Sequence, residues 1–185
     1  MGAGLLLLTA AVGPAAAAEA LAAPVSTNLT VSAAELKVVF LYNFTRFVKW
    51  PEHTQAEPDA PIVIGIQDPE PVRESLHAIE KKTTHGRPVR IRYCRNADDV
   101  DGCHVLFVNA ADAKDRRPLL EKAANQSILT VGDADSFLEE GGIVRFVLQG
   151  DRLRLQIRLK LAQQAGLDLD ARLLQIAEII HDDKP

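Results

Sequence analysis

The chain has 185 residues, of which 47% are hydrophobic and 25% are charged, and its formal net charge is -4 at pH 7. This balance is typical of a soluble globular protein, and it excludes a largely disordered chain and a bundle of membrane spans. The length is enough for one domain with one core, without a disulfide or metal scaffold. Because the net charge is negative and no apolar run spans a bilayer, we expect neither a nucleic-acid partner nor membrane insertion.

Residues 1–23 are almost entirely Leu, Ala, Gly and Val. Their apolar run, residues 5–12, is too short for a transmembrane helix, and the alanines that follow are the small residues that signal peptidase recognises. We therefore predict that residues 1–23 are a cleaved signal peptide and that residues 24–185 form the mature domain outside the cytoplasm. The alternative is an Ala-rich disordered arm, since no Lys or Arg precedes Leu5.

A capping box, Ser32-Ala33-Ala34-Glu35, begins a predicted helix. Apolar residues then recur at helical spacing as far as Trp50-Pro51, where we expect the helix to stop. These residues are Leu36, Val39, Phe40, Phe44, Phe47 and Val48. The sequence therefore predicts a long amphipathic first helix.

Strand and helix patterns alternate through the middle of the chain. Short apolar runs predict strands over residues 62–67, 89–93, 104–109 and 128–131, and amphipathic segments predict helices over residues 69–80 and 112–124. This order is typical of a parallel sheet whose strands are joined by helices.

Two further strands are predicted to form an antiparallel hairpin around Gly150-Asp151. A two-residue loop there would pair Val144 with Ile157, Phe146 with Leu155 and Leu148 with Leu153. One face of the hairpin is then wholly apolar and should lie on the core.

A final helix should follow the hairpin. Its expected cap is Asp168 or Asp170, and its apolar stripe is Leu173, Leu174, Ala177 and Ile180. The predicted fold class is thus a single α/β domain over residues 24–185. We expect a mostly parallel sheet with helices on both faces, extended by the C-terminal antiparallel hairpin and a closing helix.

The predicted strand ends carry no recognisable catalytic set. The sequence contains no Gly-x-Gly-x-x-Gly, Walker, Gly-x-Ser-x-Gly or His-Glu-x-x-His motif. The five histidines lie on separate predicted elements, without metal-ligand spacing. We expect a protein that is not an enzyme and has no cofactor and no metal.

Gly132 and Asp133 end a predicted strand, which is where α/β folds bind ligands. They are the candidate strand-end ligand site, although a helix start capped by Asp133 explains the same residues.

Four arginines share the second face of the hairpin: Arg145, Arg152, Arg154 and Arg158. They could bind an anion or an acidic partner surface. A solvated or helix-covered sheet face would produce the same alternation.

Cys94 closes one predicted strand and Cys103 opens the next. If these strands were parallel neighbours, the two cysteines would lie at opposite sheet edges, too far apart for a disulfide. A Cys94–Cys103 bond would need antiparallel strands, or a fold-back of residues 95–102 along the sheet. The alternative is a buried Cys103 and a free thiol at Cys94.

Several segments resemble the periplasmic YfiR-type proteins of Gram-negative bacteria. They are residues 36–51, 102–108, 128–133, Phe137, residues 141–146 and residues 165–177, in the family's order. The resemblance therefore covers nearly all of the mature chain.

The resemblance implies a Rossmann-like, non-enzymatic periplasmic regulator. Such a protein binds the periplasmic domain of an inner-membrane diguanylate cyclase and represses cyclic di-GMP synthesis, which controls biofilm formation and motility. The family also implies an outer-membrane lipoprotein that sequesters the repressor, and a homodimer. The alternative function is a periplasmic small-ligand sensor or solute-binding module, motivated by the strand-end residues and the arginine row.

This chain departs from the family in two places. Family members commonly have Asn where this chain has Arg158, and many pair the cysteine equivalent to Cys103 with one on the first strand, where residues 62–67 contain none. Cys94 is either a substitute partner for Cys103 or unrelated to the family's bond.

Overall fold

A computed structural model describes residues 31–54, 59–150 and 152–181, except for the side chain of His53. These residues belong to one compact unit, which begins at Val31. The predicted signal peptide and the hairpin-loop residue Asp151 lie outside the described residues.

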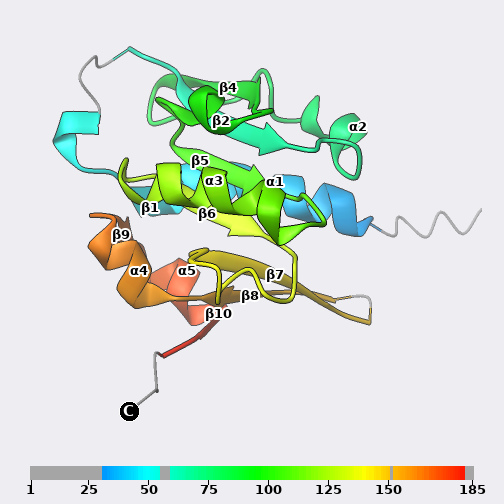
Figure 1. Ribbon diagram of the computed structural model, residues 1–185. Coiled ribbons are helices and arrows are strands. Elements are labelled where there is room, and N and C mark those ends of the chain that lie inside the picture. The colour runs from blue at the N-terminus through cyan, green and yellow to red at the C-terminus, as the bar shows by residue number, and fades with distance from the viewer. Residues whose placement is uncertain (1–30, 55–58, 151, 182–185) are drawn as a thin grey trace, which may run out of the picture. The chain divides into compact units, whose positions relative to one another are not determined.

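One large sheet forms the centre of the described unit (Figure 1). Its eight strands are β2 (Ile62–Gln67), β3 (Thr83–Thr84), β4 (Arg87–Tyr93), β5 (Val105–Val108), β6 (Leu129–Gly132), β7 (Val144–Gln149), β8 (Arg152–Ile157) and β10 (Ala177–Ile179). They lie in the order β10-β8-β7-β6-β5-β2-β4-β3. Strands β4, β2, β5, β6 and β7 run parallel, which confirms the predicted mostly parallel, Rossmann-like α/β fold.

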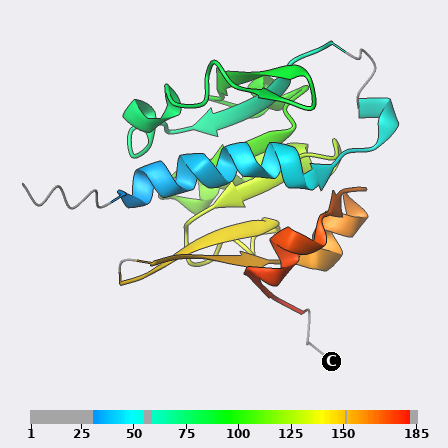
Figure 2. The same ribbon diagram turned by 180° about the vertical axis from the view of Figure 1, so that it is seen from behind.

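The first helix, α1 (Ala33–Phe47), covers one face of this sheet, as the reverse view shows (Figure 2). The predicted capping box is present: the Ser32 side chain accepts from Glu35 N, and the Glu35 carboxylate accepts from Ser32 N. The ring of Phe44 stacks on that of Phe146 at 6.2 Å. The helix ends before Trp50-Pro51 because residues 48–49 become a strand instead.

That strand, β1 (Val48–Lys49), pairs antiparallel with β9 (Asp168–Leu169). A short 3-10 helix, η1 (Glu52–Thr54), follows β1. The pairing fixes the end of α1 against the C-terminal part of the chain.

A second helix, α3 (Ala113–Ala124), lies on the opposite face of the sheet from α1, as comparison of the two views shows. Its buried residues Leu119, Leu120 and Ala123 pack with Leu106 and Phe137 in a separate core cluster. Helices on both faces are therefore confirmed. None of the helices in the described ranges is long and apolar enough to cross a bilayer.

The hairpin of β7 and β8 has the register predicted from its loop. Val144 pairs with Ile157, Phe146 with Leu155 and Leu148 with Leu153. The pairs nearest the sheet centre are buried, whereas Leu148 at the far end is 56% exposed. The apolar face thus continues beyond the part that α1 covers.

The C-terminal segment corrects the expected single final helix. It forms α4 (Leu159–Gln164), β9, α5 (Ala171–Gln175) and β10 in succession. Asp170 does cap α5, by accepting from Arg172 N, but the helix ends after one turn. Residues 177–179 then pair with β8, because that strand offers open backbone groups and β-branched residues, here Ile179 and the flanking Ile176 and Ile180, favour strands.

The helix expected over residues 69–80 is also shorter than predicted. Only α2 (Arg73–Leu76) is helical, and turns occupy the flanking residues. Its N-cap, Val72, has no side-chain group to satisfy the first amides, so nothing extends the helix backwards. Residues 97–100 form a further 3-10 helix, η2 (Ala97–Val100).

Candidate functional site

The two cysteines lie side by side although they flank strands that are not neighbours. Strand β2 separates β4 from β5, and residues 95–102, which include η2, fold back over the sheet. Both Sγ atoms lie 2.9 Å from the position that a Cβ on Gly65 would occupy. The missing side chain of Gly65 therefore makes the room in which Cys94 and Cys103 meet.

Both cysteines are buried, free thiols in this structure. A hydrogen bond from Cys94 lowers the pKa of Cys103, with a smaller contribution from the positive charge of Arg92. The hydrogen bond with Cys103, together with burial, raises the pKa of Cys94. Cys103 is therefore the thiol that ionises first, and it would be the nucleophile in any thiol chemistry here.

The strand-end residues Gly132 and Asp133 serve the packing of two other elements. A Cβ on Gly132 would lie 2.4 Å from the Phe137 ring. The Asp133 carboxylate accepts from Lys37 Nζ at 2.6 Å, which joins β6 to α1. The Asn109 amide, oriented with its nitrogen toward Asp133, donates to both carboxylate oxygens at 2.9 and 3.0 Å.

The arginine row divides into two pairs. Arg145 and Arg158 are half-buried and hold the segment between β6 and β7, through an ion pair with Asp135 and a 2.7 Å hydrogen bond to the Leu138 carbonyl. Arg152 and Arg154 lie near the hairpin tip and are exposed. Of the four, only this second pair has the exposure that contact with an acidic partner requires.

A groove of about 620 Å³ runs between α1 and α2, a feature that the sequence alone did not predict. Its floor is apolar, with Val38, Tyr42 and Ile79 among the lining residues. Val31 and Val39 also line it and are 53% and 49% exposed, which is unusual for large apolar side chains. Val39 belongs to the apolar spacing predicted for the first helix and was expected to face the core, whereas Val31 precedes the capping box. The exposure of Val39 corrects that expectation.

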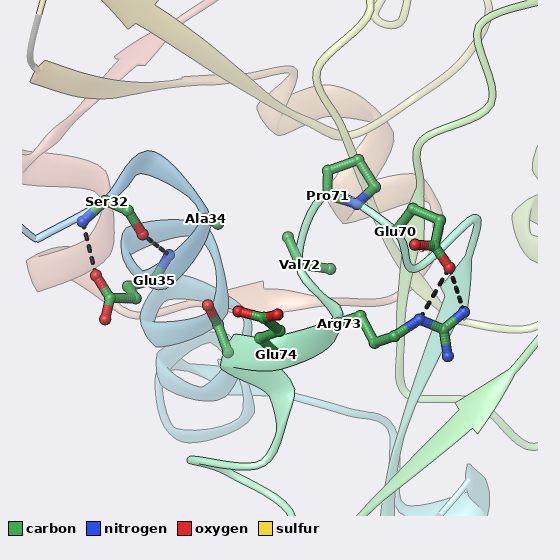
Figure 3. A pocket seen from close by; sticks show the side chains of 9 residues that line it. Ser32, Ala34, Glu35, Glu70, Pro71, Val72, Arg73 and Glu74 are labelled. Atoms are coloured by element: carbon green, nitrogen blue, oxygen red, sulfur yellow. Dashed lines mark hydrogen bonds and ion pairs between the residues drawn. The ribbon is translucent and has the colours of Figure 1, made fainter.

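The ends of this groove carry opposite charges. Glu35, in the first turn of α1, and Glu74 line one end, and Arg46, in the last turn of α1, and Lys82 line the other. Glu35 and Glu74 also line an adjoining cavity of about 520 Å³, in which Arg73 is paired with Glu70 (Figure 3). The two cavities therefore form a continuous acidic-to-apolar surface along α1.

No group of three or more His, Cys, Asp or Glu side chains in the described ranges could hold a metal ion.

Comparisons with known proteins give a family and a fold. Residues 34–178 match the model of the YfiR/HmsC-like family. Among curated proteins there is no match. Two solved structures are similar: a conserved domain protein from Vibrio cholerae O1 biovar eltor, with 14% identity and a TM-score of 0.49, and an ABC domain in complex with L-Trp from Streptococcus pneumoniae, with 13% identity and a TM-score of 0.51.

Each of these two alignments covers 80% of this chain and 60% of the other. The chain thus spans less than two thirds of the length of either structure. At 13% identity, the likeness to the Streptococcus pneumoniae structure concerns the fold alone.

Proposed function

The chain belongs to the YfiR/HmsC-like family, and from this premise we propose that it represses an inner-membrane diguanylate cyclase by binding the cyclase's periplasmic domain. At the level of the family, it is a periplasmic regulator of diguanylate cyclase signalling. The observation that carries the proposal is the extent of the family match, which includes both faces of the sheet and the C-terminal elements up to residue 178. Biofilm formation and motility are the expected outputs.

Repression of this kind is a shift in populations. The protein must bind the inactive state of the cyclase more tightly than the active state, because equal affinity for both would change nothing. Repression of this kind needs no catalytic group, so a non-enzymatic regulator is sufficient for it.

The groove between α1 and α2 is the contact surface that we assign to the cyclase. An amphipathic helix of the partner fits it, because such a helix offers an apolar stripe at the spacing of a groove between two helices. The carboxylates of Glu35 and Glu74 favour a basic residue on that helix, and Arg46 and Lys82 favour an acidic one. Exposed Val39 lies among these charges and is the best single position to test.

The direct test is binding between the purified mature protein and the periplasmic domain of a cyclase from the same organism, measured by calorimetry. We expect Val39→Glu to weaken binding at least tenfold, since it places a charge on the apolar floor. Ile176→Glu is the matched control, because Ile176 is 62% exposed but lies beside β10, outside the groove. Absence of binding to every envelope cyclase domain would contradict the proposal.

The exposed pair Arg152 and Arg154 is a second surface for an acidic partner. Reversal of both charges, with Arg152→Glu and Arg154→Glu, tests it in the same assay. An effect comparable to that of Val39→Glu would move the cyclase contact to the hairpin.

The remaining partners follow from the family. We include in the proposal an outer-membrane lipoprotein that sequesters the repressor, and a homodimer. Light scattering of the purified protein tests the dimer, and co-purification from the cell envelope tests the lipoprotein.

Small-ligand sensing is the second candidate function. The observation that favours it is a cavity of about 300 Å³ that Trp50, Cys103 and His104 help to line. It lies where β5 begins, at the opposite edge of the sheet from Gly132 and Asp133. It is compatible with repression, because a ligand could change the affinity for the cyclase.

A further inference from the structure

The outer side of α1 carries one stripe of side chains that reach the solvent. In the reverse view, no other described helix or strand lies in front of this helix (Figure 2). Glu35, Val39, Tyr42 and Arg46 follow one another at intervals of three or four residues, so they lie on the same side of α1. All four line the groove between α1 and α2, and Val39 is 49% exposed. The stripe therefore has an apolar centre between two charged ends.

The stripe is symmetric about its centre. The midpoint between Glu35 and Arg46 along the helix is also the midpoint between Val39 and Tyr42. If a second copy of α1 crossed the first antiparallel at this point, Glu35 of each copy would face Arg46 of the other. Val39 of each would face Tyr42 of the other. A two-fold axis between two copies produces this arrangement, because it brings the same patch of both molecules together.

The charges beside the stripe have the same polarity. Glu74 lines the groove and, with Glu35, the adjoining cavity at the start of α1 (Figure 3). Lys82 lies toward the other end, with its Nζ 5.2 Å from the centre of the Tyr42 ring. The dipole of α1 favours an acid in its first turn and a base in its last, which accounts for Glu35 and Arg46. It does not account for Glu74 and Lys82, because neither belongs to α1.

We propose that a second copy of this chain occupies the groove, with its α1 antiparallel to the first. Each Val39 then packs in the apolar centre of the opposite groove, and opposite charges meet at both ends. A parallel arrangement would place Glu35 beside Glu35 and Arg46 beside Arg46, and like charges in contact disfavour it. A partner surface with charge of a single sign fits less well, since one end of the groove would repel it.

This pairing covers the surface that we assign to the cyclase. Two copies joined through the groove cannot bind a cyclase domain there, so self-association would hold the regulator in reserve until a cyclase competes for the groove. This consequence rests on the proposed function, whereas the pairing itself rests on the stripe and its charges.

Charge reversal at one end of the stripe tests the pairing. Glu35→Arg brings two positive charges together at each end of the pair, and Arg46→Glu brings two negative charges together. Each variant alone should therefore associate at least tenfold more weakly than the unchanged protein. An equal mixture of the two variants should form dimers again, because opposite charges meet at both ends of the mixed pair.

Analytical ultracentrifugation compares the two variants, their mixture and the unchanged protein, and circular dichroism checks that each variant is folded. Arg117→Glu is the matched control, because Arg117 is an exposed arginine on α3, on the opposite face of the sheet. It should associate like the unchanged protein.

A second measurement uses the unchanged protein, in case a variant does not fold. Acetylation of Lys82 by acetic anhydride should become slower as the protein concentration rises, because the pairing covers the groove. Acetylation of Lys114 should not, since this residue lies on α3 and its side chain is 77% exposed.

Three results would overturn the proposal. They are a monomer up to millimolar concentration, a mixture that associates no better than its two components, and protection of Lys82 that does not depend on concentration. The last would mean that another part of the same chain covers the groove. These measurements contain no cyclase, so they do not depend on the proposed function. With a cyclase domain added, the dimer should separate, and a cyclase domain bound to the intact dimer would contradict the exclusion.

Discussion

Phe137 shows how a single side chain explains two glycines. A Cβ on Gly132 would lie 2.4 Å from its ring, and a Cβ on Gly142 would lie 2.2 Å away. Phe137 is fully buried between these two residues, which belong to segments on either side of it. Both glycines are therefore required by side-chain packing, and Gly132 needs no ligand to explain it.

Substitution of Gly132 by Ala should destabilise the protein by about 1–3 kcal/mol, the usual cost of overpacking a core. Chemical denaturation followed by circular dichroism measures this loss. Phe137→Leu in the same chain should recover part of it, since a smaller side chain leaves room for the new methyl group. Strict additivity of the two substitutions would contradict the proposed clash.

His104 makes a prediction about pH. Its pKa is about 4 in the folded protein and 6.5 as the unperturbed value, so the unfolded chain binds the proton more readily. The free energy of unfolding therefore has its full value above pH 6.5, where His104 is neutral in both states. It falls as the pH drops toward 4, because the unfolded chain is protonated first. Between pH 7 and pH 4.5 the loss should be roughly 2–3 kcal/mol.

Urea denaturation at the two pH values measures this loss, with His104→Asn as the non-titrating reference. The unchanged protein should lose more stability than the variant over the same interval. Equal losses would show that His104 is not held neutral by the fold.

At the scale of elements, one buried ion pair joins α3 to the segment between β6 and β7. The Arg116 guanidinium, 3% exposed, donates to both oxygens of Glu140 and to the carbonyls of Ala110 and Ala111. This contact lowers the pKa of Glu140 and raises that of Arg116. The same segment carries Phe137, so the ion pair helps to position the ring.

Removal of the guanidinium by Arg116→Ala should cost about 3–5 kcal/mol, because it leaves the Glu140 carboxylate and two carbonyls without their donor. Arg117→Ala is the matched control, since the neighbouring Arg117 is exposed. Thermal denaturation compares the two variants. A similar, small effect of both substitutions would contradict the structural role of the pair.

The loop that carries η2 makes a prediction about oxidation. Glutathione disulfide should oxidise this pair of thiols. The Cys103 thiolate attacks it and releases one reduced glutathione, and the Cys94 thiol then displaces the second glutathione to leave a Cys94–Cys103 disulfide. The loop that such a bond closes is short, so the gain in stability should be about 2–3 kcal/mol. Mass spectrometry detects the bond, and thermal denaturation with and without reductant measures the gain.

Cys94→Ser is the control for this prediction, because it should abolish the effect of reductant on stability. Failure to find an intramolecular disulfide under oxidising conditions would leave the two residues as packing groups around Gly65.

Elements with strong local signals were the ones that sequence alone predicted well. The capping box of Ser32 and Glu35 located the start of α1, and the two-residue loop fixed every pair of the hairpin. The prediction of a single final helix was wrong, because the apolar spacing of this segment suits both a helix and a short strand. Only the open edge of β8 decides between the two. Local pattern contains no information about that edge.

At the scale of the whole molecule, candidate sites were harder to predict than the fold. The meeting of Cys94 and Cys103 depends on Gly65, which lies on a third element. The groove beside Val39 and the cavity beside His104 likewise depend on three-dimensional packing, because sequence spacing does not show which side chains line a cavity. The family was recognisable from the order of segments, and the match over residues 34–178 agrees with it.

The central claim is repression of a cyclase through the groove along α1. The measurement that tests it most directly is cellular cyclic di-GMP in the native host after deletion of the gene, with complementation by the intact gene or by Val39→Glu. Deletion should raise cyclic di-GMP, the intact gene should restore the parental level, and Val39→Glu at equal periplasmic abundance should not. An unchanged level after deletion, under conditions in which the protein is produced, would contradict the account.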